Sequence, residues 1–141
     1  MTSVFFDTYA WVEYLEGSEE GEAARRYLED EECQVYTSIL TVAELSDVFQ
    51  RGGLRTKLEW TRIENFMLLN STLVALDARE MAEAGALKAQ RKRQFKDFGL
   101  IDAIILRSSR KVGAKLLTND PHLLSESDAM PLRQPPSPSE K

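Results

Sequence analysis

Short apolar runs separated by segments of helical periodicity are the feature that most restricts the fold of this sequence. Five strands are expected, over residues 4–6, 34–36, 72–76, 114–118 and, more briefly, near 130–132. Helices are expected at 8–16, through 23–28, and at 38–50, 56–69, 78–93 and 99–112. Continuous apolar strands are typical of a sheet that is buried on both faces. The alternation predicts an α/β domain with three α/β/α layers and a central parallel sheet of four or five strands.

The chain length fits one domain with an apolar core that needs no disulfide or structural metal. We expect this domain to span residues 1–133 and the proline-rich segment 134–141 to be a disordered tail. A lone Cys33 excludes an internal disulfide and is expected as a small buried side chain. No apolar run reaches membrane-spanning length and no N-terminal targeting pattern is present, so the expected location is the cytoplasm.

Two acidic residues follow predicted strands. Asp7 ends the first strand and Asp120 comes after the fourth. Parallel sheets bind ligands outside the carboxyl ends of their strands, so both side chains are expected at that edge. Each also has a purely structural interpretation, because Asp7 is a suitable helix N-cap and Asp120-Pro121 is favourable in a turn.

Two further acids lie within predicted helices. Glu44 shares a helical face with apolar residues four positions before and after it, and Asp102 lies on a strongly apolar stripe. A carboxylate on such a face is costly unless a cation or hydrogen bonds compensate it. The alternatives are that Thr41–Glu44 forms a capping box and that Asp102 pairs with a neighbouring Arg or Lys.

Four acids in these positions fit a shared site for Mg²⁺ or Mn²⁺, and the chemistry that needs such a site is phosphodiester hydrolysis. Clustered carboxylates repel one another and raise one another's pKa values, so such a site should bind a divalent ion readily.

Four sequence blocks resemble the conserved blocks of the PIN-domain family in order and separation. They are Phe5-Phe6-Asp7-Thr8, Thr41-Val42-Ala43-Glu44-Leu45, Ile101-Asp102-Ala103-Ile104-Ile105 and Leu117-Thr118-Asn119-Asp120. The resemblance covers nearly all of the chain except the tail. It implies a parallel sheet of strand order 3-2-1-4-5, with the four acids converging on one or two Mg²⁺ or Mn²⁺ ions. Thr8, Thr118 and Asn119 match positions that support the acids through hydrogen bonds.

A compact PIN protein with a glutamate in the second block is similar to the VapC-type toxins of prokaryotic toxin–antitoxin pairs. That resemblance implies an endoribonuclease that hydrolyses RNA, is held inactive by an antitoxin and forms a homodimer. The alternatives are a housekeeping RNA-processing PIN nuclease and a non-catalytic PIN-fold interaction module. A haloacid-dehalogenase-type phosphatase is disfavoured, because that family expects an aspartate where this chain has Tyr9.

A basic segment stands out in a chain whose net charge is −5. It contains Lys88, Arg91, Lys92, Arg93 and Lys96. These side chains are expected either to contact an RNA backbone or to complement the dipole of a solvated helix end. Two residues near the acids have open roles: Asp97 is either an extra acid of the cluster or a loop residue, and His122 is either a substrate contact or a loop histidine.

Overall fold

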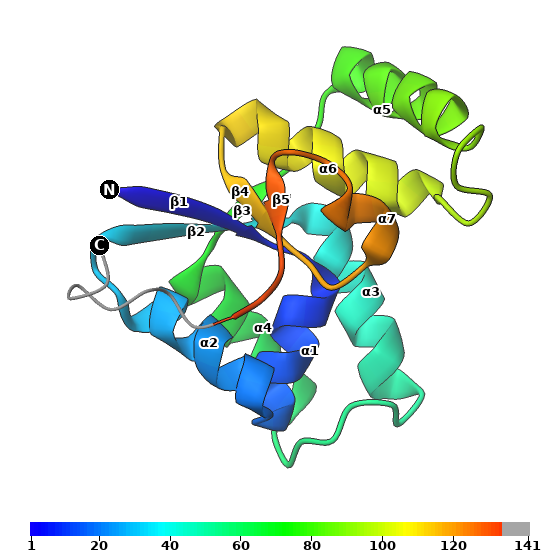
Figure 1. Cartoon of the computed structure of the whole chain (residues 1–141). Helices are drawn as coiled ribbons and strands as arrows, with labels where there is room; N and C mark the ends of the chain where they lie inside the picture. Colours follow the sequence, from blue (N-terminus) through cyan, green and yellow to red (C-terminus); the bar gives the residue numbers. More distant parts are fainter. Residues whose placement is uncertain (134–141) are drawn as a thin grey trace.

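The computed structural model describes residues 1–133, and the predicted tail at 134–141 lies outside the described residues. Its centre is a five-stranded parallel sheet in the order β3-β2-β1-β4-β5 (Figure 1). The strands are β1 (Thr2–Phe6), β2 (Cys33–Ser38), β3 (Thr72–Val74), β4 (Lys115–Leu117) and β5 (Ala129–Met130). The predicted α/β class and the strand order implied by the resemblance are both confirmed.

Helices cover both faces of this sheet, as the continuous apolar strands predicted. One layer contains α1 (Thr8–Glu16), α2 (Glu19–Glu29), α3 (Ile39–Gln50) and α4 (Trp60–Asn70). The other contains α5 (Ala78–Arg91), α6 (Leu100–Val112) and the short α7 (Pro121–Leu124). In β1 the side chains alternate between the layers: Val4 and Phe6 join the first core and Phe5 joins the second.

Close packing of α1 against α2 fixes the direction in which α1 leaves β1. Gly17 ends α1 with a left-handed backbone (φ 71°), which lets the chain reverse into α2. Gly21 then lies against the end of α1, where an added Cβ would come within 2.1 Å of the Glu13 carbonyl oxygen. Only glycine therefore allows this approach of the two helices.

Among the differences from the predicted elements, those at α4 and α7 have local causes. α4 begins at Trp60 rather than at residue 56, because the Arg55 N–H donates to Glu16 Oε2 (3.0 Å) and the Leu58 N–H donates to Thr56 Oγ1 (3.2 Å). β3 ends at Val74, two residues early. α7 was not predicted, because a single turn shows no periodicity.

Cys33 begins β2 and is half-buried, and burial raises the pKa of its thiol to about 11, in keeping with an unreactive side chain. None of the helices within residues 1–133 combines the length and the apolar character needed to cross a membrane.

Candidate active site

Asp7 stands where β1 meets α1, at the carboxyl edge of the sheet. Its Oδ1 accepts a hydrogen bond from the Ala10 N–H (3.0 Å), so it is the N-cap of α1. It is also only 7% exposed and forms no ion pair within residues 1–133. Helix capping alone does not need such burial, because a cap at the surface makes the same bond.

The pKa of Asp7 is raised to about 7, mainly by burial and also by the charges of Glu44 and Asp120. The Thr118 hydroxyl and the Ala10 N–H oppose this shift, because they stabilise the carboxylate. Near neutral pH the fold therefore holds a buried acid beside two other acids, and no positive side chain of residues 1–133 pairs with it.

Glu44 lies in α3 and faces the start of α1. The Thr8 hydroxyl donates to Glu44 Oε1 (2.6 Å) and lies 3.3 Å from Thr41 Oγ1. α3 is capped by Ser38, whose hydroxyl accepts from the Leu40 N–H (3.1 Å). The capping-box interpretation of Glu44 is therefore wrong, and Thr8 connects the first conserved block to the second.

Asp120 follows β4, the strand next to β1, so Asp7 and Asp120 leave adjacent strands at the same edge. The Asp120 N–H donates to Thr118 Oγ1 (3.1 Å), and Asp120 Oδ1 accepts from the His122 N–H (2.8 Å). Asp120 thus caps α7, with Pro121 at the first helical position. The turn interpretation is correct for its backbone, while its second carboxylate oxygen, Oδ2, receives no such bond.

Asp102 lies in the first turn of α6 and accepts from the Gly99 N–H through Oδ2 (3.1 Å). Burial raises the pKa of Asp102, the charge of Asp120 raises it further, and the Gly99 N–H and His122 oppose this. No ion pair within the described part of the chain includes Asp102. The predicted alternative, pairing with a neighbouring Arg or Lys, is therefore wrong.

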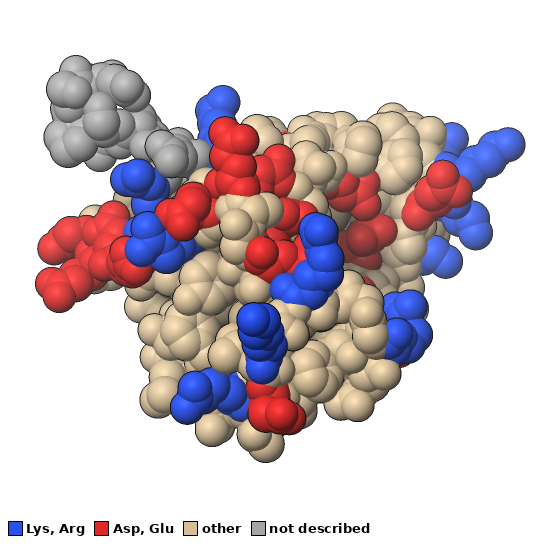
Figure 2. Space-filling model, turned by 90° about the horizontal axis from the view of Figure 1, so that it is seen from below, with Lys and Arg blue, Asp and Glu red and all other residues tan. Residues whose placement is uncertain are grey.

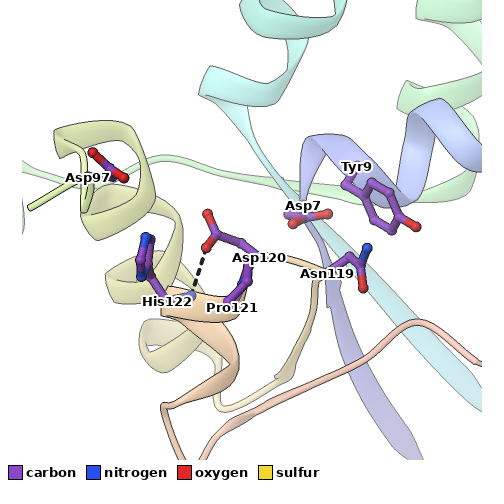
Figure 3. Close-up of a pocket in the computed structure, with 7 residues that line it drawn as sticks. All are labelled: Asp7, Tyr9, Asp97, Asn119, Asp120, Pro121 and His122. Carbon is purple, nitrogen blue, oxygen red and sulfur yellow. Dashed lines mark hydrogen bonds between the residues drawn. The ribbon is translucent and has the colours of Figure 1, made fainter. Parts of the chain in front are cut away.

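A cavity of about 520 Å³ opens at this edge of the sheet. It is lined by Asp7, Tyr9, Asp97, Asn119, Asp120, Pro121 and His122. Figure 3 shows Asp7 and Asp120 at its centre, Tyr9 and Asn119 to one side, and Asp97 and His122 to the other. Glu44 and Asp102 do not line the cavity, but the charge of Glu44 acts on Asp7 and the charge of Asp120 acts on Asp102.

The donor set has the chemistry that Mg²⁺ and Mn²⁺ prefer, since all four candidate ligands are carboxylates. The uncompensated burial of Asp7 fits a cation as its partner. In residues 1–133, however, no three His, Cys, Asp or Glu side chains come close enough to form a ready-made metal site. The charges of Glu44 and Asp120 act on Asp7, and that of Asp120 acts on Asp102, so a cation held by all four acids would have to draw the carboxylates together against their repulsion.

The sequence matches the PIN domain family over residues 4–126, which includes all four acids. The chain belongs to the PIN-domain family. A chain from a toxin–antitoxin complex of Klebsiella pneumoniae has the same fold, with a TM-score of 0.69 and 21% identity over 93% of this chain and 98% of that one. VapC20 of Mycobacterium tuberculosis, described as a sarcin–ricin loop cleaving toxin, has a TM-score of 0.67 and 18% identity over 86% and 93% of the two chains. No curated protein sequence matched.

The charged side chains are unevenly distributed over the surface. On the face shown in Figure 2, acidic side chains gather near the centre and at the left edge, and Lys and Arg side chains lie between and around them. In the basic segment, Arg91 is bound to Glu126 by two hydrogen bonds. Lys92 and Arg93 are exposed just after α5 and Lys88 is half-buried within it.

Three residues of the PIN-domain cavity were missed or left open in the sequence. Tyr9 lines the cavity, and its place two residues after Asp7 was the one available signal. His122 was an open question: it lies in α7 rather than in a loop, its ring is 4.7 Å from that of Phe95, and its Nδ1 is buried without a hydrogen-bond partner within residues 1–133. Asp97 is an exposed turn residue that also lines the cavity, in keeping with its predicted loop role, while its role as an extra acid of the cluster stays a prediction.

Proposed function

We propose that this PIN-domain chain is a divalent-cation-dependent endoribonuclease and the toxin of a prokaryotic toxin–antitoxin pair. The observation that carries the proposal is Asp7, a buried carboxylate with a raised pKa, at the centre of a cavity it shares with a second acid. A fold tolerates such a group when a cation or substrate compensates it.

In this proposal Asp7, Glu44, Asp102 and Asp120 hold Mg²⁺ or Mn²⁺. A bound cation of this kind offsets negative charge on phosphate oxygens and makes a neighbouring water more acidic. Thr8 orients the Glu44 carboxylate through its hydroxyl, and Thr118 acts on both Asp7 and the Asp120 backbone. Asn119, exposed at the cavity, offers an amide to the substrate.

We favour an RNA substrate because the resemblance to VapC-type toxins covers all four sequence blocks that contain the candidate acids. The structural neighbours named above point the same way: one comes from a toxin–antitoxin complex and the other is described as cleaving the sarcin–ricin loop. We accordingly propose a protein antitoxin and a second copy of this chain as partners, the cytoplasm as location, and residue 133 as the end of the domain.

The products of cleavage test the proposed chemistry. Attack by water that expels the 3′ oxygen leaves a 5′-phosphate and a 3′-hydroxyl, whereas attack by the RNA's own 2′-hydroxyl leaves a 2′,3′-cyclic phosphate. Purified protein should cleave RNA to 5′-phosphate ends, lose activity in EDTA and regain it with Mg²⁺ or Mn²⁺. Cleavage that survives EDTA, or cyclic phosphate ends, would rule out the proposed reaction.

A further inference from the structure

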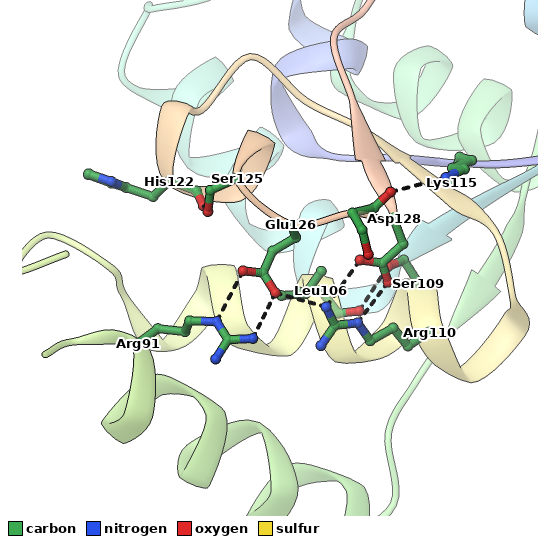
Figure 4. A network of polar contacts seen from close by, with 10 residues as sticks. Arg91, Leu106, Ser109, Arg110, Lys115, His122, Ser125, Glu126 and Asp128 are labelled. Atoms are coloured by element: carbon green, nitrogen blue, oxygen red, sulfur yellow. Dashed lines mark hydrogen bonds and ion pairs between the residues drawn. The ribbon is translucent and has the colours of Figure 1, made fainter. Parts of the chain in front are cut away.

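Two arginines hold a single carboxylate just beyond α7. Arg91, the last residue of α5, donates from Nε to Glu126 Oε2 (3.0 Å) and from Nη2 to Glu126 Oε1 (2.9 Å). Arg110 of α6 donates from Nη2 to the same Oε1 (2.8 Å). The Glu126 side chain is only 9% exposed, so water screens these charge-assisted bonds weakly (Figure 4).

The same network fixes the chain after Glu126. Arg110 also donates from Nε to Asp128 Oδ2 (2.7 Å) and from Nη2 to Oδ1 (3.1 Å). The carbonyl of Asp128 accepts from the Leu116 N–H of β4 (2.9 Å). Residues 126–128 are therefore connected to α5, α6 and β4 together.

The segment before Glu126 carries half of the cavity wall but has little structure of its own. Asn119, Asp120 and His122 belong to it, and α7 is one turn long. A single helical turn is not stable by itself, so its position depends on tertiary contacts. Within the segment the Glu126 N–H donates to the Leu123 carbonyl (3.0 Å) and the Ser125 hydroxyl donates to the His122 carbonyl (2.7 Å).

We propose that Arg91 is a positioning residue of the active site, which acts through Glu126 on α7 and so on the Asp120 carboxylate that α7 presents. The inference rests on the proposed function only in taking Asp120 as a cation ligand. It removes Arg91 from the set of expected RNA contacts, because two of its three guanidinium nitrogens, Nε and Nη2, donate to Glu126. Lys88, Lys92 and Arg93 keep that expected role.

Arg107 provides a matched control. It also joins α5 to α6, through Nε to Glu83 Oε2 (3.0 Å) and through Nη2, 3.7 Å from Glu80 Oε2. Its side chain is 23% exposed, against 24% for Arg91, but its partners lie on α5 and not near α7. Arg107→Ala therefore removes a similar ion pair from the same helical layer and leaves the Glu126 network intact.

Amide hydrogen exchange tests the structural step, the action of Arg91 through Glu126 on α7, without a measurement of enzyme activity. In Arg91→Ala and in Glu126→Gln, the Leu124 and Glu126 amides should exchange about tenfold faster than in the wild type, because charge-assisted bonds that close this segment are lost. The amides of β1 should not change, and Arg107→Ala should leave the α7 amides at wild-type rates. Unchanged α7 exchange in both variants would overturn the inference, whether or not the chain is a nuclease.

Mn²⁺ affinity and the salt dependence of RNA binding test the functional step. Arg91→Ala and Glu126→Gln should each weaken Mn²⁺ binding about tenfold, because loss of a group that orients a metal ligand lowers the metal affinity. Arg91→Lys should lose less Mn²⁺ affinity. If Arg91 contacts RNA instead, Arg91→Ala flattens the salt slope by about one unit and Glu126→Gln leaves Mn²⁺ affinity unchanged. That second pattern would overturn the positioning role. Absence of Mn²⁺ binding in the wild type together with faster α7 exchange in the variants would reject the proposed function but not the structural step.

Discussion

Two groups of acids lie at the ends of the segment that joins β4 to β5, and the protein treats them in opposite ways. At its start, Asp120 faces Asp7 across the cavity, and neither forms an ion pair within residues 1–133. At its end, Glu126 and Asp128 are bound to Arg91 and Arg110. Arg91 and Arg110 therefore neutralise the acids at the end of this segment, whereas the two cavity acids have no such partner within residues 1–133.

The pKa values show the same contrast. Burial raises the pKa of Asp7 to about 7. Hydrogen bonds from Arg91, followed by those from Arg110, lower the pKa of Glu126 below its usual value in spite of its burial. Acids that fix structure are paired, and acids left unpaired in a cavity are available to a cation.

The largest expected effect is that of Asp7→Asn on cleavage. Loss of this carboxylate should lower the proposed RNA cleavage on the order of a thousandfold or more, as removal of a central active-site group does. Asparagine is itself a good N-cap, so α1 should keep its start. Rates measured beside circular dichroism spectra check this. Near-wild-type cleavage by a folded Asp7→Asn protein would contradict the role assigned to Asp7.

The next largest effect is expected in the pH dependence of stability, measured without divalent cations. It should distinguish the unpaired acids at the cavity from the paired acids Glu126 and Asp128. The folded pKa of Asp7, about 7, lies above its ordinary value of 3.8, so the folded chain retains a proton that the unfolded chain releases. The free energy of unfolding therefore keeps the full contribution of Asp7 below pH 3.8. It falls by at most about 4 kcal/mol as the pH rises from 3.8 to about 7. Denaturant titrations from pH 4 to 8 should show this decline in the wild type but not in Asp7→Asn. Equal profiles for the two proteins would contradict the raised pKa.

The contribution of Glu126 to stability should change with pH in the opposite direction. Its folded pKa is lowered from 4.5, so its stabilising contribution is present above that pH and is lost as pH falls through the lower folded value. Arg110→Ala, which unpairs Asp128 and removes one of the two partners of Glu126, should cost about 1 kcal/mol at pH 7, since Arg110 is partly exposed to solvent. A urea titration measures this. No loss of stability would mean that the network does not anchor the segment.

The smallest effect is expected from the rest of the basic segment. If Lys88 and Lys92 contact phosphates, replacing both with Ala should weaken RNA binding and reduce its salt slope by about one unit for each lost contact. Fold and Mn²⁺ affinity should stay the same. Binding measured at several salt concentrations, with Arg107→Ala as control, checks this. An unchanged slope would assign these lysines to solubility or helix capping.

The sequence predicted the fold well because the apolar strands and the helical stripes are long enough to show their periods. It also placed Asp7 and Asp120 at one sheet edge, because a parallel sheet brings its strand ends together. The resemblance supplied the strand order, which periodicity alone did not contain.

What could not be predicted depends on contacts between distant residues. Arg91 belongs to a run of basic residues, and nothing in that run distinguishes it from Lys92; only the folded chain brings Glu126 to it. Likewise, Thr41–Glu44 matches a capping box, but the N-cap of the helix is Ser38, three residues before Thr41. Tyr9 lines the cavity from the first turn of α1, and only its closeness to Asp7 in the sequence indicated this.

The central claim is that the four acids form one cation site, and calorimetric titration with Mn²⁺ tests it most directly. Asp102 lies outside the cavity lining but is coupled to Asp120, whereas Asp97 lines the cavity as an exposed turn residue. The wild type should bind Mn²⁺, Asp102→Asn should bind it at least about tenfold more weakly, and Asp97→Asn should bind it within about twofold of the wild type. Equal affinity in the wild type and Asp102→Asn would contradict the four-acid site.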